Sequence, residues 1–111
     1  MVILDWELVI LQQDLIFVVD KNHCCYIVIC GDNTLYCGYS NDVEKRVGNH
    51  NKGCVGAKYT RSRRPVKLVY YERFESKSEA LKRERQIKKL TRIEKLKLIN
   101  SPSNLLRYYN L

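Results

Sequence analysis

Four side chains of unlike chemistry lie within one short stretch of the chain: Tyr26, Tyr36, Arg46 and His50. Each phenol could orient a water molecule, and Tyr36 could accept its proton. The imidazole is a rival base because its ordinary pKa of about 6.5 suits neutral pH. A guanidinium stays charged, and its forked donors suit a phosphate on which negative charge develops. The alternatives are tyrosines that fill the core and a surface arginine paired with Asp42, and the choice of base between Tyr36 and His50 stays open.

Glu84 is a fifth candidate, further along the chain. In the helix expected there, Ala80, Leu81 and Ile87 lie four before, three before and three after it, so its carboxylate lies on or beside the apolar stripe. It could pair with Lys88, four residues on. It could also ligate Mg²⁺, which commonly binds through one or two carboxylates while it keeps several waters. The helix alone does not decide between these roles.

The first two tyrosines belong to a predicted β-hairpin. Residues Tyr26–Cys30 form an apolar run typical of a buried strand, Gly31–Thr34 has the composition of a turn, and Leu35–Gly38 is the expected returning strand. This arrangement places one tyrosine on each arm.

Helical periodicity follows the hairpin. Asn41 is the expected N-cap of a helix whose third position is Glu44, and two valines then recur on one side. Arg46 and His50 are four residues apart, so they share a face of this helix.

A third strand and two further helices are predicted in the second half of the chain. Residues Val66–Phe74 form the strand, although the imperfect alternation of apolar residues indicates that both faces are partly covered. Capping-box patterns predict a helix that begins at Ser76 and runs to about Leu90, and a shorter one that begins at Thr91 and reaches Ile99.

These residues together resemble the GIY-YIG nuclease family, and most closely its small stand-alone bacterial members. Cys24-Cys25-Tyr26 lies at the position of the first triplet, and Tyr36-Cys37-Gly38 at that of the second. Arg46 and His50 match the arginine and the tyrosine-or-histidine that follow. The run from Ala80 to Lys88 is similar to the helix that carries the metal-binding glutamate. The resemblance covers roughly Cys24 to Asn100.

The resemblance implies an α/β (α+β) fold, with a small mixed β-sheet of about three strands flanked by about three helices. It implies a divalent-metal-dependent endonuclease that hydrolyses phosphodiester bonds in DNA, in repair, recombination or nucleic-acid processing. Mg²⁺ (or Mn²⁺) would be held by Glu84, and Gly38 would let the backbone approach the phosphate or the helix start. The catalytic residues, expected to line one concave surface, are Tyr26, Tyr36, Arg46, His50 and Glu84. The alternatives are a non-catalytic nucleic-acid-binding module on the same fold and an interaction adaptor that uses the apolar N-terminal segment.

Charge favours a nucleic-acid partner independently of the family. The 20 lysines and arginines outnumber the 12 acids, and 15 of them lie between Lys58 and Lys97 against five glutamates. A solvated basic surface is the alternative, but a strongly positive half is typical of proteins that bind a polyanion. The residues expected to contact nucleic acid are Lys58, Tyr59, Arg61, Arg63 and Arg64 in a polar loop, and Lys88 on the helix.

The rest of the composition indicates one small cytoplasmic domain. The five cysteines are odd in number and form no C-x-x-C pair, which favours reduced thiols over zinc or disulfides. The apolar N-terminal stretch is interrupted by Asp5, Glu7 and Asp14, so neither a membrane anchor nor a signal peptide is expected. We expect residues 1–22 to form an extension of unknown role, 23–100 the nuclease-like domain and 101–111 a C-terminal tail.

Overall fold

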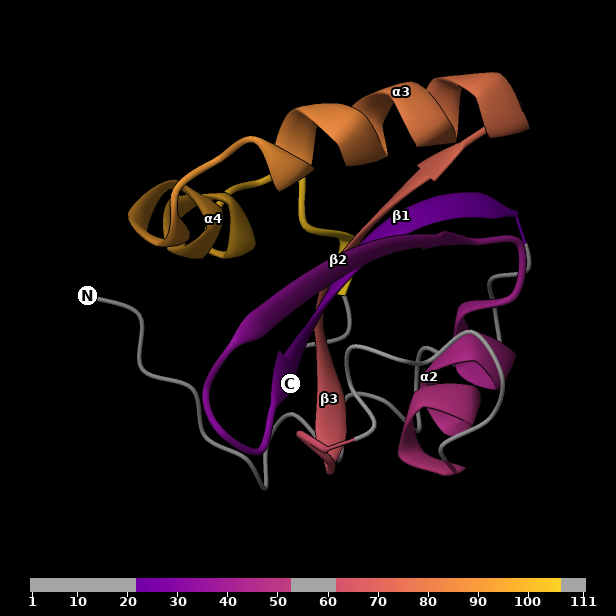
Figure 1. The fold of residues 1–111 in the computed structure, drawn as a ribbon. Coiled ribbons are helices and arrows are strands. Elements are labelled where there is room, and N and C mark those ends of the chain that lie inside the picture. Colours follow the sequence, from indigo (N-terminus) through magenta and orange to yellow (C-terminus); the bar gives the residue numbers. More distant parts are fainter. Residues whose placement is uncertain (1–21, 53–61, 107–111) are drawn as a thin grey trace.

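A three-stranded sheet forms the centre of the computed structural model, which describes residues 22–52 and 62–106. The strands are β1 (His23–Cys30), β2 (Leu35–Ser40) and β3 (Val66–Phe74), in the order β2-β1-β3 (Figure 1). The expected class, three strands with three helices, is confirmed. Both pairings are antiparallel, however, so within the described residues the sheet is not mixed in strand direction.

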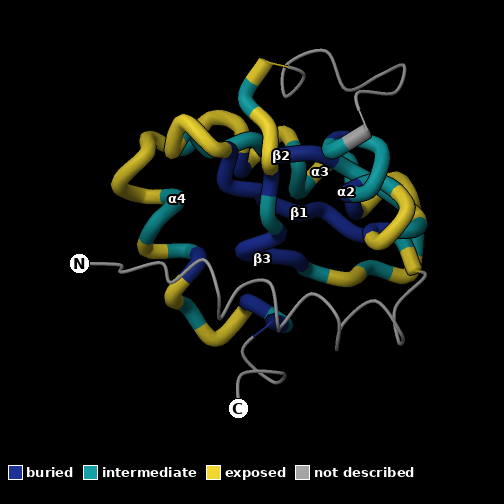
Figure 2. The backbone as a smooth tube through the Cα atoms, turned by 90° about the horizontal axis from the view of Figure 1, so that it is seen from below, coloured by how far each residue is buried: buried dark blue, intermediate teal, exposed yellow. Residues whose placement is uncertain are grey.

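The central strand β1 is buried on both faces. Residues Cys24–Cys30 are at most 3% exposed, and Figure 2 shows the strand dark blue along most of its length. Side chains alternate between the two faces of a strand, so β1 contributes to two separate cores. The even-numbered positions belong to one core and the odd-numbered positions to the other.

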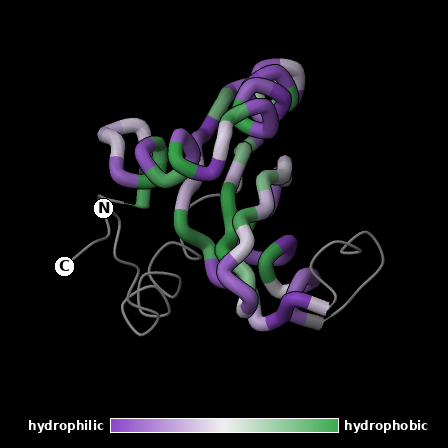
Figure 3. The backbone as a smooth tube through the Cα atoms, turned by 60° about the vertical axis from the view of Figure 1, so that its left-hand side comes forward, coloured by the Kyte–Doolittle hydropathy of each residue, from purple (hydrophilic) through white to green (hydrophobic). Residues whose placement is uncertain are grey.

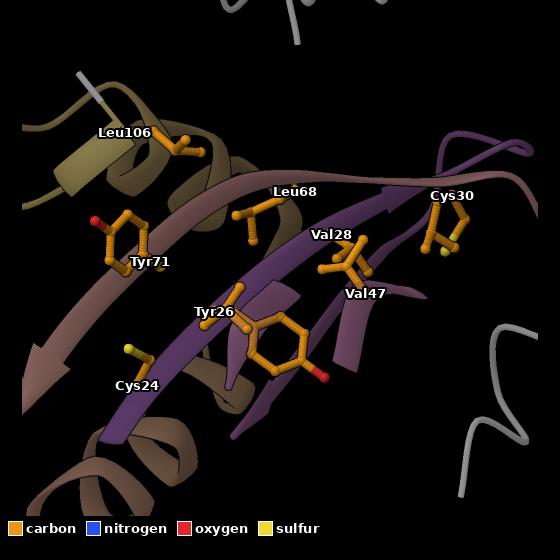
Figure 4. Close-up of a cluster of buried hydrophobic side chains, with 10 residues drawn as sticks. Cys24, Tyr26, Val28, Cys30, Val47, Leu68, Tyr71 and Leu106 are labelled. Atoms are coloured by element: carbon orange, nitrogen blue, oxygen red, sulfur yellow. The ribbon is translucent and has the colours of Figure 1, made fainter. Parts of the chain in front are cut away.

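Helix α2 (Val43–Lys52) covers the first face. Val43, Val47 and His50 follow a 4, 3 spacing, so they lie on one side of the helix and are all buried. Figure 4 shows Val47 together with Tyr26 and Val28 of β1 on this face of the sheet.

Helices α3 (Lys77–Lys88) and α4 (Arg92–Ile99) cover the second face (Figure 1). Ile87 and Ile99 pack there against Cys37 of β2 and Tyr70 of β3. In Figure 3 green and purple positions alternate along both helices, as expected for helices with one apolar side. No helix in the described ranges is long and apolar enough to span a membrane.

Two of the three helices are capped by the residues predicted from the sequence. Thr91 and Glu94 form a full capping box. Ser76 caps α3 by accepting from the Glu79 N–H, and its hydroxyl donates to the Glu79 carboxylate. The prediction that Asn41 caps α2 is wrong, because Asp42 accepts from the Lys45 N–H instead, 3.2 Å away.

A β-bulge explains the imperfect alternation in β3. The pairing with β1 shifts between Ile27 and Val28, so Val69 has no partner in the register. Val69 and Tyr70 therefore both belong to the second core, and Tyr71 returns to the first.

Asn104 holds the segment 101–106 against this bulge. Its side-chain amide donates to the Val69 and Ile99 carbonyls at 2.9 and 2.8 Å. Its oxygen accepts from the N–H groups of Tyr71 and Leu106. Asn104 is only 4% exposed, and its hydrogen bonds bring Leu106 into the first core.

Candidate active site

The centre of the candidate site is a buried hydrogen bond between β1 and α2. The Tyr26 hydroxyl lies 2.8 Å from Nε2 of His50, and the two side chains are 1% and 0% exposed. The Tyr26 ring lies directly over Gly38 of β2, where a Cβ would be 2.5 Å from the hydroxyl oxygen. Gly38 therefore makes room for Tyr26, whereas we expected it to make room for a phosphate or the start of the helix.

Tyr36 and Arg46 complete the cluster on this face. The Tyr36 ring meets the edge of the His50 ring with centroids 5.2 Å apart, and it is only half-buried. Arg46, one turn before His50 on α2, donates a hydrogen bond to the Tyr26 hydroxyl. The structure thus brings together four of the five predicted catalytic residues. Glu84 belongs to α3, which covers the other face of the sheet, so the five side chains do not line one surface as expected.

The surroundings keep both members of the central pair neutral. Burial, and then the nearby charge of Arg46, lowers the pKa of His50 to about 4, so the imidazole is uncharged at neutral pH. Burial raises the pKa of Tyr26 well above its ordinary value, although the hydrogen bond and the charge of Arg46 act in the opposite direction.

The direction of the hydrogen bond follows from the donors available. A guanidinium has donors only, so the Tyr26 oxygen accepts from Arg46. The hydroxyl proton is then free to donate to Nε2 of His50, which accepts as the unprotonated nitrogen of a neutral imidazole. A relay therefore runs from Arg46 through Tyr26 to His50.

Glu84 approaches β2 from the other face of the sheet. Its backbone carbonyl lies 3.9 Å from the Cys37 sulfur, in the core between α3 and the sheet. Burial, and then the charge of the Glu84 carboxylate, raises the pKa of the Cys37 thiol to about 12. Cys37 lies between Tyr36 and Gly38 in β2. Glu84 and the tyrosine cluster thus flank the same three residues of this strand from opposite faces.

The Glu84 carboxylate also makes the intrahelical pair considered from sequence. Its Oε2 is 3.5 Å from Nζ of Lys88, and the two side chains are 15% and 51% exposed. The described residues include no group of three or more metal-ligating side chains. A single carboxylate is a donor set that suits Mg²⁺, which takes its other oxygens from water and substrate phosphates.

The predicted nucleic-acid contacts are divided between described and undescribed residues. Lys58, Tyr59 and Arg61 lie outside the described residues. Arg63 pairs with Asp32 at 3.2 Å, and Arg64 donates to the Asn51 carbonyl at 2.9 Å.

One polar network near the site was not predicted. On the α3 side of the sheet, the Tyr70 hydroxyl and the Arg83 guanidinium both donate to Oε2 of Glu72. The available signal was Glu72 itself, an acid two residues after Tyr70 in the same strand.

Known proteins are similar to this chain over the region that contains the cluster. The GIY-YIG catalytic domain matches residues 22–97. The UPF0213 protein CPE1444 of Clostridium perfringens is 62% identical over 78 residues, which are 70% of this chain and 83% of that protein. The UPF0213 protein SSP2268 of Staphylococcus saprophyticus is 60% identical over 78 residues, 70% of this chain and 94% of that protein.

A solved structure extends the similarity to the fold. The solution NMR structure of the UPF0213 protein BH0048 from Bacillus halodurans has a TM-score of 0.50 and 42% identity, over 80% of this chain and 92% of that one. The GIY-YIG catalytic domain is a nuclease domain, and its substrate is nucleic acid. The family match spans more than half of the sequence and includes every residue of the cluster around His50. This chain therefore belongs to the GIY-YIG catalytic domain family and is similar to its small UPF0213 members.

Proposed function

We propose that this protein is a divalent-metal-dependent endonuclease that hydrolyses phosphodiester bonds in DNA. The observation that carries the proposal is the relay from Arg46 through Tyr26 to His50, with the half-buried Tyr36 ring packed on the imidazole. It holds the Arg46 cation beside the buried Tyr26 phenol, and the half-buried Tyr36 phenol lies against the same imidazole. That combination suits a reaction in which water attacks a phosphate.

Arg46 stabilises the transition state in this proposal. Its guanidinium keeps its charge, and the hydrogen bond to Tyr26 holds it in place before substrate arrives. A preorganised cation beside a phosphate on which charge develops typically contributes several kcal/mol.

Tyr36 is the residue that contacts the attacking water. His50 is fully buried and Tyr26 almost so, and both are neutral at pH 7, which favours a positioning role for this pair. Of the three, Tyr36 is the one whose side chain is only half-buried. We therefore assign the water contact to Tyr36 and not to His50.

Glu84 would hold the Mg²⁺ or Mn²⁺ ion. When bound, such an ion neutralises charge on the phosphate and stabilises the leaving oxygen. Glu84 itself provides a single partly exposed carboxylate beside β2, with the Lys88 ammonium as its partner until a stronger cation replaces it. Nucleic acid would then provide the remaining oxygen ligands.

A DNA substrate fits the charge of the exposed helix surfaces. Lys82 on α3 and Lys89 at its C-cap are exposed, so they are available for phosphates. Four described cysteines are free and buried, which agrees with a reducing cytoplasmic setting. The role we propose for the enzyme is in DNA repair, recombination or nucleic-acid processing.

The test is cleavage of plasmid, linear, branched and single-stranded DNA, and of RNA, with Mg²⁺, with Mn²⁺ and with a chelator. We expect metal-dependent cuts in DNA by the wild type. We expect none by Glu84→Ala, whose DNA affinity should be equal or slightly higher because one negative charge has gone. Arg46→Ala should lose cleavage while binding DNA only modestly less tightly.

Thermal melts must accompany both variants, since a misfolded protein would imitate a catalytic defect. Glu79→Ala is a matched control, because it removes an exposed carboxylate from the same helix. If the wild type cuts no substrate with either metal, or folded Glu84→Ala cuts as fast as wild type, the proposal fails. Binding without cleavage would favour the non-catalytic module.

A further inference from the structure

The network on the α3 side of the sheet links β3 to the helix that carries Glu84. Nε of Arg83 lies 2.8 Å from Oε2 of Glu72, and the same oxygen accepts from the buried Tyr70 hydroxyl. Nη1 of Arg83 also donates to Gln86 at 3.2 Å. The Glu72 side chain is 18% exposed, so this is a largely desolvated ion pair with a second hydrogen bond.

Arg83 and Glu84 are consecutive in α3 and point to different strands. Successive helical residues are about 100° apart around the axis. Arg83 reaches toward β3, where it meets Glu72, and Glu84 lies against β2, where it meets Cys37. Any rotation of the helix that released Arg83 from Glu72 would therefore also move the Glu84 carboxylate relative to β2.

The apolar contacts of α3 come from few side chains. The fully buried side chains of the helix are Ala80, which is small, and Ile87. At the helix start, the Lys77 ammonium lies 5.7 Å above the Tyr39 ring, but this side chain is exposed to solvent. The Glu72 pair is thus the directional contact in the middle of the helix.

We infer that Glu72 and Arg83 are positioning residues that fix the rotation of α3 and thereby hold the Glu84 carboxylate at β2 for the metal. The inference rests on the proposed function, since it assigns a purpose to the place of Glu84. The Tyr70 hydroxyl supports this ion pair, because the hydrogen bond that it donates orients the Glu72 carboxylate.

The experiment compares two arginines of one helix. Arg83→Met and Arg85→Met remove the same charge, but Arg85 is exposed on the outer side of α3. The readout is the Mg²⁺ concentration at half-maximal cleavage, at saturating DNA.

We expect Arg83→Met and Glu72→Gln to raise this concentration about tenfold or more, the range seen when groups that orient a metal ligand are lost. Arg85→Met should change it by about twofold or less. The double variant Glu72→Gln/Arg83→Met should be no worse than either single change, because both break one contact.

A second readout does not depend on cleavage. Mn²⁺ broadens the NMR signals of nearby amides, and in the wild-type protein we expect broadening at both Glu84 and Cys37. In Arg83→Met the broadening at Cys37 should weaken relative to that at Glu84, whereas Arg85→Met should keep the wild-type ratio.

The outcomes separate the inference from the proposed function. An inactive wild type that still shows the expected broadening and its loss in Arg83→Met would reject the nuclease and keep the positioning role. A folded Arg83→Met with wild-type metal dependence and wild-type broadening would overturn the inference. If Arg83→Met does not fold, Tyr70→Phe removes only the hydroxyl that orients Glu72, and an unchanged metal requirement and broadening ratio in that variant would also overturn it.

Discussion

The Tyr26 ring of β1 lies against the backbone of Gly38 in β2, and there is no room between them for even one methyl group. This contact determines where the Tyr26 hydroxyl is, and the hydroxyl in turn holds His50 of α2. The two triplets of the family are therefore joined physically, since the glycine of the second accommodates the tyrosine of the first.

Gly38→Ala should destabilise the fold and slow cleavage. Its Cβ would lie 2.5 Å from the Tyr26 hydroxyl oxygen, so the ring must move and the bond to His50 must lengthen. Overpacking of this kind costs about 1–3 kcal/mol of unfolding free energy, which urea denaturation would measure.

Gly48→Ala is the control for that change. A Cβ at this helical position meets no atom within 4 Å. We expect it to raise the free energy of unfolding by about 0.5–1 kcal/mol, because alanine favours a helix over glycine. Equal stabilities of the two variants would contradict the close approach at Gly38.

The two tyrosines should respond differently to loss of their hydroxyls. Tyr26→Phe leaves Nε2 of the buried His50 without its partner, so we expect about 1–3 kcal/mol of lost stability together with lost cleavage. Tyr36→Phe should leave stability within about 0.5 kcal/mol, since Tyr36 is half-buried, while cleavage falls about 100-fold or more. Cleavage rates and thermal melts of both variants test this difference. A fully active Tyr36→Phe would exclude a contact between Tyr36 and the attacking water.

Stability should fall as the pH is lowered from about 6.5 to about 4. The folded pKa of His50 is about 4, below the value of about 6.5 that it has when unfolded, so the unfolded chain binds the extra proton first in this window. The contribution of His50 to the free energy of unfolding is complete above pH 6.5. Its loss at low pH amounts to roughly 3 kcal/mol at most. Urea titrations between pH 7 and pH 4 would measure it.

His50→Gln is the control for the pH effect, because glutamine cannot titrate. We expect this variant to show a shallower loss of stability over the same window, although it is less stable at pH 7. A wild type and a variant with parallel profiles would show that other groups cause the acid sensitivity.

DNA affinity should depend strongly on salt. If the exposed cations of α3 and α4 neutralise phosphates, each contact contributes a slope of about −0.9 to the plot of log K against log salt. We expect a slope of about −3 or steeper in fluorescence anisotropy titrations. A flat plot would count against a nucleic-acid partner.

Local patterns predicted most of the fold. The strand Val66–Phe74 and the capping box at Thr91 were found because their signals lie within a few neighbouring residues. The cap of α2 was placed one residue early because Asn41 and Asp42 can both cap a helix. The Ser40 hydroxyl, which bonds the backbone N–H and carbonyl of Asp42, accompanies the observed choice.

The site was predicted less completely than the fold. The spacing of Val43, Val47 and His50 already places the imidazole on the apolar side of α2, but its burial depends on how the helix packs on the sheet. The Glu72–Arg83 pair joins two elements across the core, and no sequence spacing encodes such a contact. The antiparallel pairing of β3 with β1 and the β-bulge at Val69 likewise arise only when these two strands meet.

Asn104 has a consequence for how this sheet can meet other molecules. Strand β3 lies at one edge of the described sheet. The unpaired backbone groups of an exposed edge strand can pair with another chain, which then adds to the sheet as a further strand. The Asn104 amide already occupies the outward groups of Val69 and Tyr71, so β-augmentation is blocked at the bulge. The other edge of the described sheet is β2, the strand that contains Tyr36 and that Glu84 of α3 approaches.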